Sequence, residues 1–153
     1  MRLFYFVRVF FVSLEFLVLT LTFFCVRLFE PHASAIASAL AITEELIKWA
    51  ILLPITLFAW CANEGRDLIF SNPDHSKILV NWPDYWRLKQ HIVASLIYLI
   101  IFCALSGFPW LSKSGITTGP GLIFFVAGCV GCIIVAAQLY AAKMSINEIM
   151  YSE

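Results

Sequence analysis

The sequence predicts an all-α polytopic membrane protein, with four transmembrane helices in a bundle and a cytoplasmic loop between the second and third helices. Two observations support this class. Of the 153 residues, 61% are hydrophobic and 13% are charged, whereas soluble domains average about half apolar and a quarter charged. Four long apolar segments follow one another, and most charges lie between them. Because unpaired backbone is costly in lipid, these segments should be helices.

The four helices are expected at about 4–28, 46–62, 82–110 and 120–142, within a single domain that spans residues 1–153. Each is close to the roughly 20 residues that cross a hydrocarbon core. The third helix should begin in the membrane interface near Trp82, because Asn81 can cap it and Pro83 suits a first helical turn.

The second helix has two interpretations, because residues 33–62 are apolar on both sides of a charged patch. That patch consists of Glu44, Glu45 and Lys48. We predict a short span that starts near residue 46, with the patch at the outer interface and residues 33–43 forming a helix on the outer surface. The alternative is one continuous, strongly tilted helix from residue 33.

The orientation follows from the distribution of Lys and Arg, which are enriched in cytoplasmic loops. If both termini and the loop at 63–91 share one side, that side holds seven of the ten basic residues: Arg2, Arg8, Arg66, Lys77, Arg87, Lys89 and Lys143. The other side holds Arg27, Lys48 and Lys113. We therefore expect both termini in the cytoplasm and the protein in a plasma membrane, specifically a bacterial inner membrane.

A polar stripe crosses the first apolar segment. Arg8, Glu15 and Thr22 are seven residues apart, the spacing at which left-handed helix pairs touch. Ionisable residues inside a span are rare and usually face protein, so the stripe is expected to face another helix. Glu15 could be protonated and bonded to a neighbouring Ser or Thr, paired with Arg8 or Lys48, placed in a ring of subunits, or used as a proton relay.

The start of the third helix is aromatic and basic. Its side chains are expected to form an interfacial belt or a docking surface for a cytosolic partner. These residues are Trp82, Tyr85, Trp86, Arg87 and Lys89.

The last apolar segment carries small residues at spacings of three, four and seven, a pattern that allows close helix packing in lipid. They are Gly121, Gly128, Gly131, Cys132 and Ala136. Cys129-Val-Gly-Cys132 also resembles the reactive CxxC of the vitamin K epoxide reductase family, which lies in the last helix of a four-helix bundle. The resemblance implies a membrane thiol-disulfide oxidoreductase, although this chain lacks the second, loop-borne cysteine pair of that family. We interpret the segment as a packing surface.

The expected function is that of a non-enzymatic integral membrane component: an oligomeric anchor, sensor or exclusion factor of a multiprotein system, such as bacterial immunity or phage defence. It would signal through its cytoplasmic loop, with the bilayer, other copies of the chain, or a cytosolic or membrane protein as partners. The zero net charge gives no field that attracts nucleic acid. We expect no metal and no cofactor.

Two alternatives remain. One is the oxidoreductase that would use Cys129 and Cys132. The other is an ion- or proton-conducting protein or a transporter small subunit, because Ile42 to Trp49 resembles the acidic start of the second helix in small membrane subunits of tripartite solute transporters.

Overall fold

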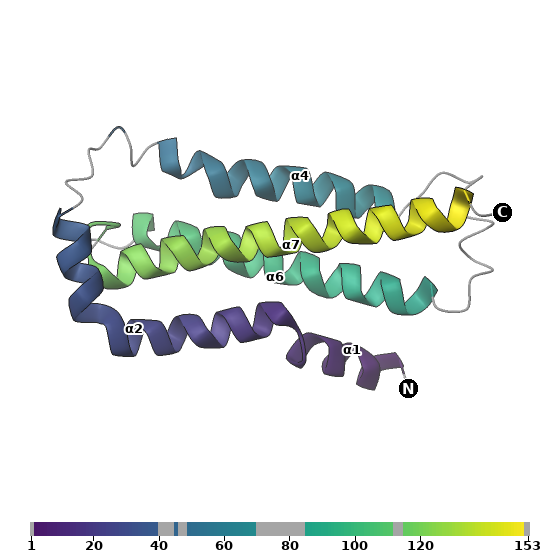
Figure 1. Cartoon of the computed structure of the whole chain (residues 1–153), viewed down its shortest axis with the longest axis horizontal. Coiled ribbons are helices and arrows are strands. Elements are labelled where there is room, and N and C mark those ends of the chain that lie inside the picture. The colour runs from purple at the N-terminus through teal and green to yellow at the C-terminus, as the bar shows by residue number, and fades with distance from the viewer. Residues whose placement is uncertain (1, 40–44, 46–48, 70–84, 112–114, 152–153) are drawn as a thin grey trace.

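The computed structural model describes residues 2–39, 45, 49–69, 85–111 and 115–151. Within these ranges every regular element is an α-helix, and five helices are present (Figure 1). In chain order they are α1 (Arg2–Phe11), α2 (Leu14–Ala39), α4 (Leu52–Ile69), α6 (Tyr85–Leu111) and α7 (Gly119–Tyr151). The all-helical class is therefore confirmed.

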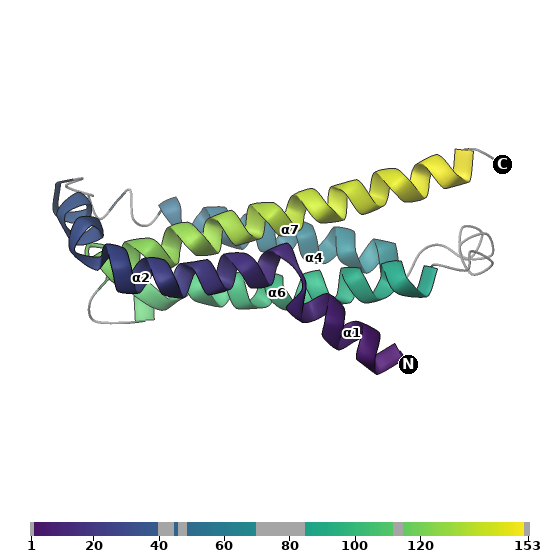
Figure 2. The same ribbon diagram turned by 60° about the horizontal axis from the view of Figure 1, so that its bottom comes forward.

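Helices α6 and α7 lie side by side and form the centre of the molecule (Figures 1 and 2). Helix α2 packs along α7, whereas α4 packs on both α6 and α7, so that α2 and α4 lie on opposite sides of the central pair in Figure 1. The buried centre is apolar and includes Cys61, Tyr98, Leu99, Phe102 and Val135. Both termini, the end of α4 and the start of α6 lie at one end of the molecule (Figure 1).

Two helical segments are long and apolar enough to cross a membrane: Tyr85–Leu111, with a mean hydropathy of 2.2, and Gly119–Glu148, with 2.5. A third crossing is added if α1 and α2 form one broken span, bent by 46°. Large apolar side chains point outward from these helices, including Phe24 on α2, Ile100 on α6 and Ile133 on α7. Exposed apolar surface on this scale suits contact with lipid, so the chain has the features of a membrane protein.

Helix α4 does not qualify as a span by the same criteria, because its 18 residues include Glu64, Arg66 and Asp67. The second helix was expected to end at residue 62, but α4 continues to Ile69. Its last turns are held against the core by Gly65, which lies close to the Leu96 side chain, and by the buried Leu68. The segment from Asn63 to Asp67 is therefore helical, and the expected loop cannot begin before residue 70.

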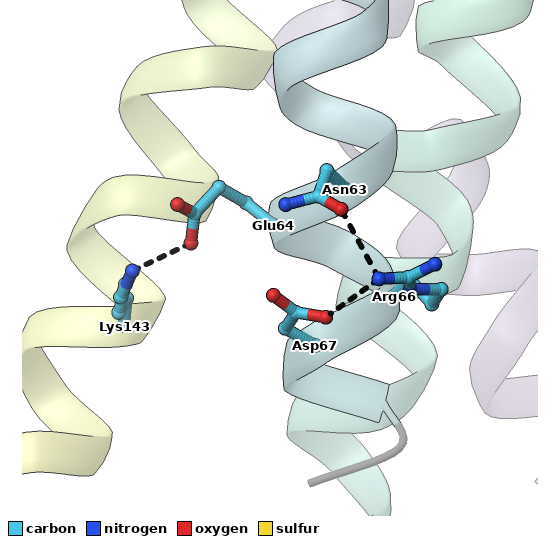
Figure 3. A network of polar contacts seen from close by, with 5 residues as sticks. All are labelled: Asn63, Glu64, Arg66, Asp67 and Lys143. Atoms are coloured by element: carbon cyan, nitrogen blue, oxygen red, sulfur yellow. Dashed lines mark hydrogen bonds and ion pairs between the residues drawn. The ribbon is translucent and has the colours of Figure 1, made fainter.

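Polar contacts anchor this end of α4 (Figure 3). The Lys143 Nζ atom of α7 donates to Glu64 Oε2 at 2.7 Å, while Arg66 Nη2 contacts Asn63 Oδ1 at 3.2 Å and Asp67 Oδ1 at 3.4 Å. The Lys143–Glu64 ion pair thus joins α7 to the end of α4 beyond the apolar core, whereas the Arg66 contacts lie within α4.

The prediction of one continuous first helix at 4–28 is wrong in two respects. The helix is interrupted between α1 and α2, and α2 continues past residue 28, through Pro31, to Ala39. Residues 33–39, predicted to be part of a separate surface helix, are the last turns of α2. These turns pack against α7. Ala33 and Ala37 are buried, and Gly119 of α7 lies so close to the backbone of Glu30 and Ser34 that a Cβ at this position would collide with it.

The remaining boundaries differ less. Helix α6 matches the predicted 82–110 from Tyr85 onward, while the expected start near Trp82 lies outside the described residues. Helix α7 begins at Gly119 and extends to Tyr151 rather than to residue 142. The alternative start of the second span near residue 33 is wrong, because residue 33 lies inside α2. The predicted start near residue 46 lies outside the described residues, and α4 begins at Leu52.

Candidate functional site

The break in the first apolar segment is stabilised by two hydroxyl groups. Ser13 caps α2, because its Oγ atom accepts a hydrogen bond from the Phe16 N–H at 3.1 Å. The Phe10 carbonyl, left near the break, accepts from the Ser13 hydroxyl at 3.1 Å and from the Tyr98 hydroxyl at 2.8 Å. Irregular backbone at membrane depth is tolerated where it is buried in protein or lines a cavity. Here the Ser13 and Tyr98 hydroxyls supply hydrogen bonds to the backbone groups at the interruption.

Glu15 lies in the first turn of α2 and is 3% exposed. The Ser95 Oγ atom of α6 is 3.0 Å from Glu15 Oε1 and 2.9 Å from Gln138 Oε1 of α7. Three helices therefore each contribute one polar side chain to a single hydrogen-bonded group. We call Glu15, Ser95 and Gln138 the polar triad.

The polar triad lines a partly open cavity of about 400 Å³ beneath the break. The Ser13, His91 and Tyr98 side chains contribute further polar groups, and the rest of the lining is apolar. The buried Glu15 side chain, the interruption between α1 and α2 and a cavity thus occur at the same place.

Helix α1 is attached to the start of α6 by ring contacts. The Tyr5 and Trp86 rings are 5.1 Å apart, and the Arg87 guanidinium lies 5.5 Å from the Trp86 ring and 5.9 Å from the Tyr5 ring. The Tyr5 hydroxyl is 3.2 Å from His91 Nε2. Deeper along α1, the Phe10 ring stacks on Tyr98 at 4.4 Å. Contacts at both ends of α1 therefore hold it over the cavity.

The predicted stripe is divided by the break. Glu15 and Thr22 are buried, and the Thr22 hydroxyl donates to the Val18 carbonyl of its own helix at 2.7 Å. Arg8 belongs to α1 and is exposed, whereas the other two residues of the stripe are buried within the chain. The change of direction at Ser13 removes the heptad relation between Arg8 and Glu15, and no ion pair joins them within the described part of the chain.

The predicted partner surface is partly used within the chain. Tyr85 packs against the core, Trp86 contacts Tyr5, and the exposed Arg87 lies against both of these rings, while Lys89 is exposed. Trp82 lies outside the described residues. In the predicted interfacial patch, Glu45 is exposed, and Glu44 and Lys48 lie outside the described residues.

The small residues of α7 are close to α6 of the same chain. A Cβ on Gly128 would come within 2.6 to 2.8 Å of Ser106 and of the Phe102 carbonyl, and one on Gly131 would overlap the Phe102 ring. Cys132 is fully buried, and Ala136 packs against the core. Gly121 differs, because it lies against Gly115 and Thr118 in the preceding turn, where the Thr118 hydroxyl caps α7.

All five cysteines are free thiols. Cys132 is 0% exposed and Cys129 is partly buried, so the pair offers a disulfide substrate little access. Among the described residues, His, Cys, Asp and Glu form no cluster that could hold a metal ion.

Sequence reasoning did not assign Ser13, Ser95, Tyr98 and Gln138 to the site. Gln138 was recognisable as an amide inside an apolar helix, which needs a hydrogen-bond partner. Ser95 carries no such signal, because a serine in a membrane helix commonly bonds to its own backbone.

No family model matches the sequence, and no curated protein or solved structure shows significant similarity to it.

Proposed function

We propose that the protein is a non-enzymatic integral membrane component that senses a condition at the bilayer and passes it to other proteins. The observation that carries this proposal is the attachment of α1, which lies over the cavity that contains the polar triad at one end and contacts the start of α6 at the other. A change in the cavity moves α1, and this movement alters the surface formed around Trp86. The sensor role is preferred among anchor, sensor and exclusion factor for this reason.

In this proposal the chain crosses the bilayer four times, with α1 and α2 counted as one broken span. The apolar part of α4, residues 52–62, covers about 17 Å at 1.5 Å per residue, so a crossing of a hydrocarbon core of roughly 30 Å also needs the apolar residues that precede Leu52 in the sequence. The first half of α4 exposes Leu52, Leu53 and Ile55, and its charged residues are confined to the end beside Lys143. That end then emerges into the cytoplasm of a bacterial cell, together with both termini.

Topology mapping tests the crossings. Reporters fused to the N-terminus and to the C-terminus should both be active on the cytoplasmic side, and a reporter inserted at 112–114 should be active on the opposite side. The expectation rests on the basic residues Arg66, Arg87, Lys89 and Lys143 near the first end. Termini found on opposite faces would contradict four crossings.

The surface around Trp86 is expected to act through association with other copies of this chain or with a partner protein. Crosslinking in native membranes followed by native mass spectrometry in detergent should detect a defined assembly. Trp86→Ala should weaken that assembly by removing the ring that contacts both Tyr5 and Arg87. Leu111→Ala, at the other end of α6 and 89% exposed, is the matched control and should leave it intact. A monomer without partners in both membranes and detergent would refute the proposal.

A further inference from the structure

The Ser95 hydroxyl lies between two oxygen atoms although it carries one hydrogen. It is 3.0 Å from Glu15 Oε1 and 2.9 Å from Gln138 Oε1. A hydroxyl donates one hydrogen bond and accepts two, whereas an ionised carboxylate and an amide oxygen only accept. One of the two contacts must therefore receive its hydrogen from Glu15 or from Gln138.

Two arrangements meet this requirement. In the first, Glu15 is protonated and donates to Ser95, which donates to the Gln138 oxygen. In the second, Glu15 is ionised and accepts from Ser95, while the Gln138 amide is rotated by half a turn so that its Nε2 atom donates to Ser95. In the first arrangement the hydrogen bonds run from Glu15 through Ser95 to Gln138, and in the second they run from Gln138 through Ser95 to Glu15. In each arrangement both Ser95 contacts contain one hydrogen.

We propose that the polar triad is a proton-binding site, in which protonation of Glu15 reverses the Ser95 hydrogen bond and rotates the Gln138 amide. Binding forms an O–H bond at Glu15 Oε1, and the proton comes from a hydronium ion in the cavity, which becomes water. Release is the reverse step. The ligand is a proton, and helix α7 carries the group that responds to it.

The residues that share the cavity with Glu15 are mostly apolar. The titratable groups that share the cavity are His91 and Tyr98 of α6, and α7 contributes the neutral Gln138. Arg8 of α1 is exposed, and neither Lys nor Arg occurs among the described residues that line the cavity. In the described part of the chain, the hydrogen-bond partner of Glu15 in the cavity is therefore the Ser95 hydroxyl and not a cation.

Proton binding at this site does not depend on the oligomeric state or on a partner. The proton-binding proposal can therefore be refuted while the proposed function holds, and the proposed function can be refuted while Glu15 still binds a proton. Infrared spectroscopy of the full chain in lipid nanodiscs, with ¹³C-labelled glutamate, measures it directly. The wild type should show a protonated-carboxyl band that grows as pH is lowered, in addition to the bands of the exposed acids. Glu15→Gln should lose that component. Identical titrations of the wild type and of Glu15→Gln would overturn the proposal.

A second measurement follows the rotation of the Gln138 amide, which we call the relay. The chain has two glutamines, Gln90 and Gln138, so ¹⁵N-glutamine labelling gives two side-chain amide signals, and Gln138→Met assigns them. In the wild type the Gln138 signal should shift over the pH range in which the Glu15 band changes. In Ser95→Ala the band should still change, whereas the amide signal should stay constant.

Ser106→Ala is the matched control, because Ser106 is a buried serine on the same helix that donates to the Cys103 carbonyl. It should preserve the wild-type response of Gln138. A Gln138 signal that is insensitive to pH in the wild type, or that follows pH equally in Ser95→Ala, would overturn the relay. The wild-type result alone decides the question if a variant does not fold.

Discussion

Gly128→Ala is expected to lower the free energy of unfolding by about 1 to 3 kcal/mol, the range found for overpacked cores. The added methyl group would lie 2.7 Å from the Phe102 carbonyl oxygen and 2.8 Å from the Ser106 nitrogen. These are backbone atoms of α6, so relief requires the two central helices to separate. Unfolding in detergent, followed by circular dichroism, measures the effect.

Gly107→Ala is the matched control for this substitution. Gly107 lies in α6, and a Cβ there would meet nothing within 4 Å. Replacement should be neutral or stabilise the helix by up to about 1 kcal/mol, because alanine has the higher helix propensity. Equal stabilities of the two variants would contradict the close approach of α6 and α7.

Tyr98→Ala is expected to destabilise the chain by about 3 to 5 kcal/mol, the usual cost of removing a large buried aromatic side chain. Tyr98 is 1% exposed, stacks on Phe10 and donates to the Phe10 carbonyl. Its loss leaves a cavity between α1 and α6 and removes one of the two hydroxyls at the break. Thermal unfolding in detergent measures the stability, and proteolysis near the N-terminus reports the release of α1.

Tyr98→Phe separates the two contributions of this residue. It keeps the ring stacked on Phe10 and removes only the hydroxyl, so we expect a loss of about 1 to 3 kcal/mol, the range for a buried polar group that loses its partner. The Ser13 hydroxyl still donates to the Phe10 carbonyl, which favours the lower part of that range. A Tyr98→Ala variant with wild-type stability would show that α1 does not dock on α6 in this way.

The helical class and the apolar spans followed from composition, because the length and hydropathy of α6 and α7 are encoded locally. The burial of Glu15 and Thr22 matches their seven-residue spacing within one helix. Arg8 does not share this burial, because the seven-residue spacing assumes a continuous helix and the helix is interrupted near Ser13. The apolar residues on both sides of Ser13 give no sign of the interruption. Tertiary contacts from Tyr98 help to fix that break.

The end of α4 was misassigned for a different reason. Five consecutive residues, Asn63 to Asp67, contain three charges, and a polar run beside an apolar segment is typical of a loop. Their helical structure depends on contacts with other helices, namely Gly65 with Leu96 and Glu64 with Lys143. The polar triad depends on contacts of the same kind, because residues 15, 95 and 138 meet only after three helices have packed.

The length of α7 has a mechanical consequence. Its 33 residues span about 50 Å at 1.5 Å per residue, and fitting this length within a hydrocarbon core of about 30 Å would need a tilt of about 50°, beyond the usual limit of about 40°. A membrane-crossing α7 must therefore protrude from the bilayer, and Asn147 and Glu148 belong to its polar end. Gln138 lies 13 residues before Tyr151. A small tilt of α7 about a point near the triad would therefore displace the protruding turns by a larger distance than it displaces Gln138.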